Sequence, residues 1–580
     1  MNYTPQFFLN RIIALRNGRI EHFLTIVAAT IVVATYLSSS LHAQERFAII
    51  GDFGNLSSTA TNVATRLSTM KPTWIATTGD NIYTTGGTTA EFDNAIGNLY
   101  GAYIKGSASA TGTATINNFY PSAGNHDVDT AGGSLLQNYR NYFDLTNSND
   151  SAISSSSGNE RFYDFVRGDV HTFVLSSDTR DSSALGGGQA IGSPQRTWFN
   201  NALAASTSTW NVVTFHHPSY STEATSGDHS SNPYMQWGFS SGSNTAQVIY
   251  NGHAHSYERT VTPATGQQYV LEGSGGQSTR GFDAPVLSGT AQTVFRDTTD
   301  PSVVTAEGGR SYNGFSIAEA NSTHYTQKHF QANGKLLDHF TLVSPGNVLA
   351  STSFSKGNSN GYMFAQDTQL SQSAPGVSFG SATTITVDSL DAGGQATQVL
   401  LRFDQLFGLS AGQIPMNAEI ASATLNIDVT NAGSGLSVYQ MLADWQDTST
   451  WSSLVDGVSS DGIEAALAGN YDVTVGTGNS GGSSATNVGV GAFSLDVTKS
   501  LRAWANGDVN RGWLLNFLAS GTNGVGFSSS DSTAAAFRPR LDVEYISAVP
   551  EPSSAILAGI ALSTILVRRG RRLCVSLEHA

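Results

Sequence analysis

Cysteine is almost absent from this chain. Its 580 residues contain a single cysteine, Cys574, close to the C-terminus. A lone cysteine excludes an intrachain disulfide, and it excludes a metal site built from cysteine thiolates in the body of the protein. Any metal site must therefore use His, Asp, Glu, Asn or Tyr, which are ligands for borderline or hard metal ions.

Charged residues are also scarce, and basic ones most of all. The chain has 29 Lys and Arg against 44 Asp and Glu, a net charge of −15, and charged residues make up 13% of it. The negative balance excludes a general nucleic-acid or anionic-membrane binder, because polyanions are repelled. It does not exclude a small anionic substrate held by metal ions. The length allows two or three domains, and the 60 glycines favour short strands joined by turns over helical bundles.

Both ends of the chain have the patterns of targeting segments. Residues 1–43 contain arginines, an apolar run over 23–37 and Leu41-His42-Ala43, which is typical of a secretory signal peptide, with an uncleaved anchor as the alternative. Residues 547–580 contain Val549-Pro550-Glu551-Pro552, an apolar run over 553–567 and an arginine cluster. This tail resembles the PEP-CTERM sorting signal of bacterial exported proteins. The resemblance implies export to the bacterial cell envelope or beyond, transient membrane anchoring and an exosortase-type processing partner.

The distribution of histidine divides the rest of the chain into two regions. No histidine lies between His339 and His579, so a catalytic or metal centre is expected before about residue 345. Residues 44–345 alternate strand-like runs, at 47–50, 74–78, 211–215 and 247–250, with helical segments, which predicts an α/β domain. Residues 346–546 contain short, alternating, turn-separated strands, which predicts an all-β sandwich.

Polar clusters end the strands of the first region. They are Gly51-Asp52-Phe53-Gly54, Gly79-Asp80-Asn81-Ile82-Tyr83, Gly124-Asn125-His126-Asp127, the segment ending in His216, and Gly252-His253-Ala254-His255. Ligands bind at the carboxyl ends of strands in α/β sheets. Two Asp, one Asn and three His provide enough donors for two metal ions that share one carboxylate, the arrangement that stabilises both oxygens of a phosphoryl transfer.

This ordered set resembles the calcineurin-like metallophosphoesterases and, through Tyr83 in the second cluster, the purple acid phosphatases. The resemblance implies a metallophosphoesterase-type β-sheet sandwich flanked by helices. It also implies that Asp52, Tyr83 and His255 bind Fe(III), that Asp80 bridges, and that Asn125, His216 and His253 bind a divalent Fe, Zn or Mn.

The same resemblance implies further roles near the metal ions. His126 is expected to face the phosphate, Asp127 to orient His126, and His229 to assist the leaving group. His217 is either a substrate contact or a structural hydrogen-bonding residue. His171, inside the strand-like run 170–174, is interpreted as structural.

The second region resembles the DNRLRE family of extracellular β-sandwich modules, with a jelly-roll-like fold. The matching stretches include Leu400-Leu401-Arg402-Phe403-Asp404 and Arg538-Pro539-Arg540-Leu541. The resemblance implies attachment to cell-surface polysaccharide. Four tryptophans are either sugar-stacking platforms or core residues, of which the core is the simpler interpretation: Trp445, Trp451, Trp504 and Trp513.

Taken together, the sequence predicts an exported dinuclear-metal phosphatase. It is expected to hydrolyse small phosphate monoesters by attack of metal-bound hydroxide on phosphorus, with no nucleic-acid partner. One alternative is a phosphodiesterase acting on nucleotides or phospholipid headgroups. Another is a surface polysaccharide-binding protein whose phosphatase-like domain is vestigial.

Overall fold

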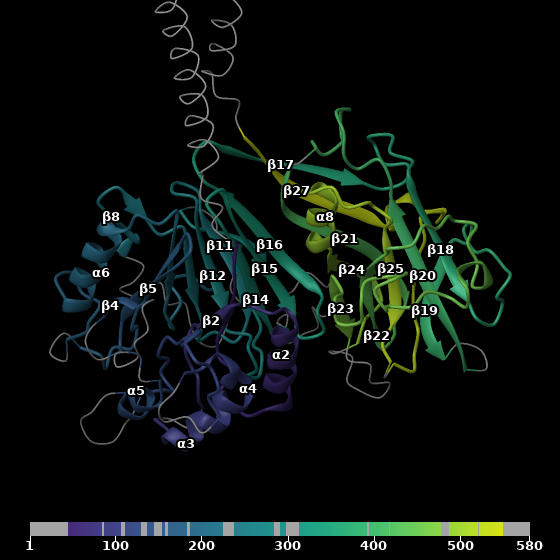
Figure 1. Cartoon of the computed structure of the whole chain (residues 1–580). Coiled ribbons are helices and arrows are strands. Elements are labelled where there is room, and N and C mark those ends of the chain that lie inside the picture. Colours follow the sequence, from purple (N-terminus) through teal and green to yellow (C-terminus); the bar gives the residue numbers. More distant parts are fainter. Residues whose placement is uncertain are drawn as a thin grey trace, which may run out of the picture. The chain divides into compact units, whose positions relative to one another are not determined.

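A computed structural model describes most of the chain between residues 44 and 548 (Figure 1). The described ranges are 44–83, 86–105, 111–128, 136–143, 145, 153–156, 160–182, 186–223, 237–282, 290–296, 312–390, 394–416, 418–476, 487–519 and 521–548. The expected signal peptide and nearly all of the expected sorting tail lie outside these ranges, so both stay predictions.

The first region contains two mixed sheets. The six-stranded sheet has the order β16-β15-β14-β1-β2-β3, in which β1, β2 and β3 are parallel and the others antiparallel. Its strands are β1 (Glu45–Ile50), β2 (Trp74–Thr77), β3 (Phe119–Tyr120), β14 (Gly314–Ala320), β15 (His324–Gln331) and β16 (Leu336–Val343). The runs predicted at 47–50 and 74–78 are therefore the parallel strands β1 and β2.

The second sheet has eight strands in the order β13-β11-β12-β10-β7-β6-β5-β4. Its centre, β6-β7-β10-β12, is parallel. The strands are β4 (Ile153–Ser156), β5 (Tyr163–Arg167), β6 (Val170–Val174), β7 (Trp210–Thr214), β10 (Val248–Asn251), β11 (Tyr257–Thr262), β12 (Gln267–Glu272) and β13 (Gln292–Arg296).

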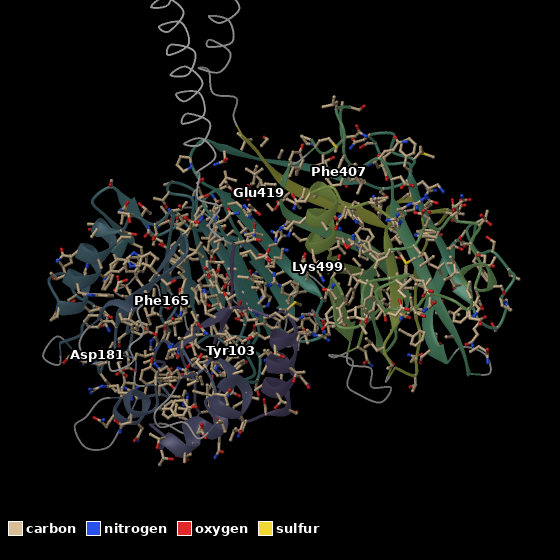
Figure 2. All side chains as sticks on the ribbon, viewed as in Figure 1. Tyr103, Phe165, Asp181, Phe407, Glu419 and Lys499 are labelled. Atoms are coloured by element: carbon tan, nitrogen blue, oxygen red, sulfur yellow. The ribbon has the colours of Figure 1, made fainter. Side chains whose placement is uncertain are left out.

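Alternate residues of the central strands fill two hydrophobic cores. Val212 and Val248 belong to the large core between the two sheets, whereas Val213 and Ile249 belong to a smaller core on the outer face. Successive side chains of a strand point to opposite faces, so a run that is apolar at every position indicates a strand covered on both sides. Phe165, labelled in Figure 2, lies in the large core.

Few helices accompany these sheets. α6 (Pro194–Ala205) covers the outer face of the second sheet with Phe199 and Leu203, and α2 (Ser58–Thr69) packs Val63 and Leu67 into the large core. The others in the described part of this region are short: α3 (Thr89–Phe92), α4 (Asn98–Tyr100) and α5 (Gln137–Phe143). None of the helices in the described ranges is both long and apolar enough to cross a bilayer.

The second region is a curled antiparallel sheet. Its nine-strand path is β17-β27-β21-β26-β19-β20-β25-β22-β23, with β18 paired to β20 and β24 paired to β21. The strands are β17 (Asn347–Phe354), β18 (Ala365–Ser371), β19 (Thr384–Leu390), β20 (Gln395–Phe403), β21 (Glu419–Asn431), β22 (Gly435–Gln440), β23 (Val473–Gly476), β24 (Gly491–Asp496), β25 (Trp513–Phe517), β26 (Val525–Ser528) and β27 (Arg540–Ala548). The predicted fold class, α/β sheets followed by a β-sandwich, is confirmed.

Two details of the second region refine the sequence interpretation. All four tryptophans weighed as sugar platforms are buried, which confirms the core interpretation: Trp445, Trp451, Trp504 and Trp513. A helix, α8 (Thr498–Ala505), interrupts the strands and buries Leu501 and Trp504. The three-residue spacing of those apolar residues is a helical signal inside a region otherwise patterned as strands.

Buried charges join the two regions, which belong to one compact unit from Glu45 onward. Lys328 of β15 donates to both carboxylate oxygens of Asp496 at 2.9 Å. Arg66 of α2 donates to the carbonyl of Thr474 at 2.5 Å and to that of Gly476 at 2.6 Å. Because Lys328 and Arg66 are nearly inaccessible to water, these contacts replace hydration that the two cations lose on burial.

Candidate metal centre

The predicted ligands lie at the carboxyl ends of parallel strands in both sheets. Asp52 follows β1 and Asp80 follows β2, while His216 follows β7 and His253 follows β10. Asn125 lies in the loop after β3. The two sheets pack face to face over the large core, and their strand ends therefore bring ligands from distant parts of the sequence to one place.

The backbone at these strand ends is strained. Asp52, Asp80 and His253 have φ values of 57°, 50° and 71°, the left-handed region that residues with a side chain rarely adopt. Gly124 allows the close approach of two loops, because a Cβ there would lie 2.2 Å from the backbone nitrogen of Asp80. Strain of this kind is kept where the position of a side chain matters more than stability.

One group of donors surrounds the Tyr83 hydroxyl. The hydroxyl donates to Asp52 Oδ1 at 3.0 Å and lies 3.1 Å from His255 Nε2. The other ring nitrogen of His255, Nδ1, lies 3.0 Å from the carbonyl of Ser278. Since a carbonyl oxygen only accepts, Nδ1 carries the proton and the lone pair of Nε2 faces Asp52 and Tyr83.

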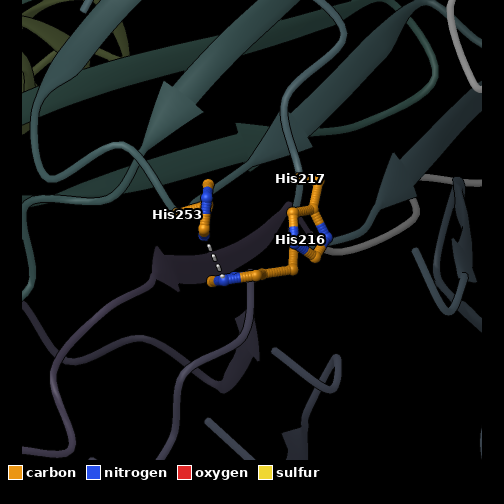
Figure 3. Close-up of side chains that lie close together, drawn as sticks. All are labelled: His216, His217 and His253. Atoms are coloured by element: carbon orange, nitrogen blue, oxygen red, sulfur yellow. Dashed lines mark hydrogen bonds between the residues drawn. The ribbon is translucent and has the colours of Figure 1, made fainter. Parts of the chain in front are cut away.

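A second group surrounds the Asn125 amide. His216 Nε2 and His253 Nδ1 each lie 2.9 Å from Asn125 Oδ1, and these two nitrogens are 3.2 Å apart (Figure 3). His216 Nδ1 lies 2.9 Å from the carbonyl of Thr78 and must donate to it. The lone pair of His216 Nε2 therefore points toward the oxygen of Asn125, so that one acceptor faces another.

Asp80 lies between the two groups. Its Oδ1 is 3.3 Å from His216 Nε2, and the ligand atoms of Asp52, Asp80 and His216 all lie within 4.8 Å of one another. Burial raises the pKa of Asp80 to about 6. Burial and then the charge of Asp80 raise the pKa of Asp52 well above its usual value. Both shifts express unfavourable burial of negative charge, which a cation at this position would offset.

The donor set fits a dinuclear metal site. Lone pairs of buried carboxylates, imidazoles and an amide converge, and no Lys or Arg side chain is hydrogen-bonded to Asp52 or Asp80 among the described residues. Burial and the nearby Arg280 lower the pKa of His255 to about 4, which keeps its imidazole neutral at pH 7. Neutral imidazole is the form that binds metal.

Asp127 does not orient His126, and the expectation that it would is wrong. The Asp127 carboxylate accepts from the backbone of Gly124 at 2.7 Å and from the side chain of Asn81 at 2.9 Å. It also accepts from the backbone of Ile82 at 3.2 Å. A buried carboxylate accepts hydrogen bonds from nearby N–H groups that need an acceptor. Here these N–H groups belong to the two loops that carry Asp80 and Asn125. Asp127 therefore fixes those loops.

The other predicted histidines have different surroundings. The ring of His126 packs on Tyr83 at 4.7 Å between centroids, its Nε2 is 4.0 Å from Asp80 Oδ2, and its Nδ1 is hydrogen-bonded to no described residue. His217 joins His216 and His253 in a second cluster of close ring nitrogens. His171 is buried against Asp164 at 2.6 Å, in agreement with a structural role. His229 lies outside the described residues.

The loop after β6 also contributes to this centre, which the sequence interpretation missed. Ser177 Oγ lies 2.9 Å from His217 Nδ1, and Arg180 Nη2 donates to the backbone carbonyl of Asn125 at 2.9 Å. The loop has no Gly-flanked polar motif that resembles the other strand ends. The available signal was the polar run from Ser176 to Arg180 directly after the strand-like run 170–174.

Some solved structures are distantly similar to part of this chain. No curated protein matches the chain. GAP50, the anchor in the inner membrane complex of Plasmodium, is 14% identical over 52% of this chain and 89% of its own chain, with a TM-score of 0.36. The purple acid phosphatase PPD1 from yellow lupin seeds is 15% identical over 52% and 54% of the two chains, with a TM-score of 0.37. A dimetal phosphatase from Danio rerio is 12% identical over 52% and 99%, with a TM-score of 0.29.

These structural likenesses are distant and carry no conclusion about activity. The match to a family model is direct, because residues 45–257 match the calcineurin-like phosphoesterase family. That range contains Asp52, Asp80, Asn125, His216 and His253. Residues 45–257 are therefore similar to a calcineurin-like phosphoesterase domain.

Proposed function

We propose that this protein is an exported metal-dependent phosphatase that hydrolyses small phosphate monoesters. The observation that carries the proposal is the convergence of buried acceptors at the strand ends, where His216 Nε2 faces Asn125 Oδ1 at 2.9 Å with no proton between them. Two metal ions there would supply a water activated as nucleophile near neutral pH and positive charge for the phosphoryl group.

The residues of the chain have distinct tasks in this proposal. Asp52, Tyr83 and His255 would hold a ferric ion, and Asn125, His216 and His253 a divalent Fe, Zn or Mn, with Asp80 shared. The carbonyl of Thr78 accepts from Nδ1 of His216, and the carbonyl of Ser278 accepts from Nδ1 of His255. The Nε2 atoms of both histidines therefore face the centre without a proton. His126, whose side chain is 35% exposed, is the proposed contact to the phosphate.

The experiment that tests the proposal measures metal content, visible absorption and hydrolysis of p-nitrophenyl phosphate by the purified protein. We expect about two metal ions per chain, hydrolysis that chelation abolishes, and recovery when metal is returned. A protein that binds metal but hydrolyses only bis(p-nitrophenyl) phosphate is the phosphodiesterase alternative. A protein that binds no metal and hydrolyses neither ester is the vestigial alternative, which the complete donor set argues against.

Location and partners form a separate part of the proposal. The support for export, for transient anchoring and for exosortase-type processing is the pattern of the two chain ends. The four tryptophans of the second region are buried, so they do not support its attachment to polysaccharide. A cleft of about 730 Å³, lined by residues that include Ser353, Asn360, Asp542 and Glu544, is the proposed surface. Cell fractionation, and binding of the whole protein to isolated surface polysaccharide, would test these two points.

A further inference from the structure

Arg180 places a fixed positive charge beside the candidate metal centre. Its Nη2 donates at 2.9 Å to the backbone carbonyl of Asn125, one of the proposed ligands. The hydrogen bonds that Arg180 donates to Asp178 raise the pKa of Arg180 most, and the negative charge of Asp80 contributes to the same shift. The guanidinium therefore lies close enough to the centre to interact with the charges gathered there.

The buried carboxylate of Asp178 holds the Arg180 guanidinium in place. Arg180 donates through Nε to Asp178 Oδ1 at 2.8 Å and through Nη2 to Asp178 Oδ2 at 2.6 Å, the two-point geometry that fixes an arginine. Asp178 is itself buried, and Gln189 donates to its backbone carbonyl at 3.1 Å. The position of the guanidinium is thus set before any ligand arrives.

The third nitrogen of the guanidinium has no acceptor among the described residues. Nη1 carries two N–H groups, and no described residue accepts from either of them. The side chain is 40% exposed, so these donors can reach a molecule that enters from solvent. An arginine that is anchored by two of its nitrogens and open at the third is suited to bind a phosphate oxygen.

The charge of the surroundings makes such a donor useful. The chain has a net charge of −15, which repels an anionic substrate, and Asp52 and Asp80 add negative charge at the centre. A phosphate monoester carries about −1.5 to −2 charge at neutral pH, whereas a diester carries a single negative charge. A fixed guanidinium is attracted more strongly to the group with the larger charge.

We propose that Arg180 binds the phosphoryl group of the substrate and makes the site prefer dianionic phosphate monoesters to diesters. The inference rests on the proposed function and adds the residue that selects its substrate class.

The test compares the full-length protein with the variants Arg180→Ala and Arg180→Gln. Calorimetry measures the binding of inorganic phosphate, and the ratio of kcat/KM for p-nitrophenyl phosphate over bis(p-nitrophenyl) phosphate measures preference. We expect both variants to bind phosphate about tenfold more weakly or worse and to lose a similar factor in the ratio, the size expected for a hydrogen bond to a charged group. Elemental analysis of the same samples measures metal content.

A matched control is the variant Arg540→Ala. Arg540 also pairs with an aspartate two residues away, through Nε at 3.0 Å and Nη2 at 2.9 Å to Asp542, but it lies on β27 of the second region. It should change neither phosphate binding nor the ratio.

The remaining outcomes are decisive as well. Wild-type phosphate binding and an unchanged ratio in a metal-loaded Arg180→Ala protein would overturn the inference while the proposed function stands.

If Arg180→Ala loses its metal, the result for Arg180→Gln decides whether the inference holds, because glutamine can still donate to the Asn125 carbonyl. A metal-loaded Arg180→Gln protein without the preference supports the inference, and one that keeps the preference or also loses metal overturns it. A wild-type protein inactive on both esters removes the proposed function and the inference together.

Discussion

The strand ends of the first region and two acids of the second region, Asp496 and Glu544, bury carboxylates in opposite ways. At the strand ends of the first region, Asp52 and Asp80 lie close together, and burial raises the pKa of both. In the second region, burial would also raise the pKa of Asp496, but the charge of Lys328 brings it below its usual value. Burial would raise the pKa of Glu544 as well. His339 and the hydrogen bonds from Thr341 and Ser422 instead lower it to about 2.

This difference indicates which of these carboxylates are placed for chemistry. A buried acid with a cation already beside it contributes to a stable fold, or at least costs little. Buried acids that face other acceptors are unfavourable until a positive charge arrives, and such sites cluster at functional positions. The strand ends of the first region therefore accept a local loss of stability that the burial of Asp496 and Glu544 does not impose.

The largest expected effect is that of Asp80→Ala on hydrolysis. Asp80 lies between both groups of donors, so its loss should affect both metal positions. We expect kcat/KM for p-nitrophenyl phosphate to fall by more than the about 10²–10³-fold that removal of one charge-stabilising group costs. Near-normal turnover with both metal ions still bound would contradict the assignment of this centre.

A large effect on stability is expected from Lys328→Met. The substitution leaves the Asp496 carboxylate without its cation, which should lower the free energy of unfolding by about 3–5 kcal/mol. Urea denaturation of the whole protein measures it. Lys356→Met is the matched control, since Lys356 pairs with Asp531 at 2.5 Å with both side chains partly exposed, and such pairs contribute about 0–1 kcal/mol. Equal losses in the two variants would show that the ion pair between the regions does not stabilise the fold.

Much of this architecture could be predicted from local sequence. Strands such as 47–50 and 211–215 are apolar at every position and end in polar clusters, and that pattern is fixed by burial on both faces of a sheet. The contacts between the regions could not be predicted. Arg66 and Lys328 are single charged residues in otherwise ordinary elements, and only the tertiary structure places a carbonyl or carboxylate beside them.

The candidate site could be predicted only in part, for a similar reason. Residues such as Asp52 and His253 stand in motifs that carry their own glycine, which the close approach of Thr78 requires. Arg180 stands in no such motif, and its proximity to Asn125 depends on how the loop after β6 folds back. The role expected of Asp127 failed because neighbouring residues in a motif need not contact each other.

A moderate effect that depends on pH is expected from Asp367→Asn. Asp367 in the second region differs from Asp496 and Glu544, because burial raises its pKa to about 6. Its folded pKa lies above the unfolded value of 3.8, so the folded protein binds the proton more tightly and loses stability as the pH rises from about 4 to above 6. The variant should resemble the wild type near pH 4 and be more stable above pH 7, by up to about 3 kcal/mol. Thermal unfolding across this range measures the difference, with the exposed Asp447→Asn as the control. A constant difference between variant and wild type at all pH values would contradict the linkage.

The smallest expected effect on rate is that of Tyr83→Phe. This variant also tests by its colour whether the group of donors around Tyr83 binds iron. Burial, followed by the charges of Asp52 and Asp80, raises the pKa of the Tyr83 phenol well above its usual value, so a phenolate forms only beside a strongly charged cation. If that cation is ferric, the iron-loaded protein should be violet and the variant colourless, because no phenolate remains to donate charge to the metal. Asp52, Asp80 and His255 remain in the variant, so we expect turnover to fall by about tenfold, far less than in Asp80→Ala. Absorption spectra of samples with equal iron content measure the colour. A colourless wild type with full iron occupancy and activity would remove the ferric assignment but leave the wider metallophosphoesterase centre in place, because the remaining donors do not depend on the phenolate.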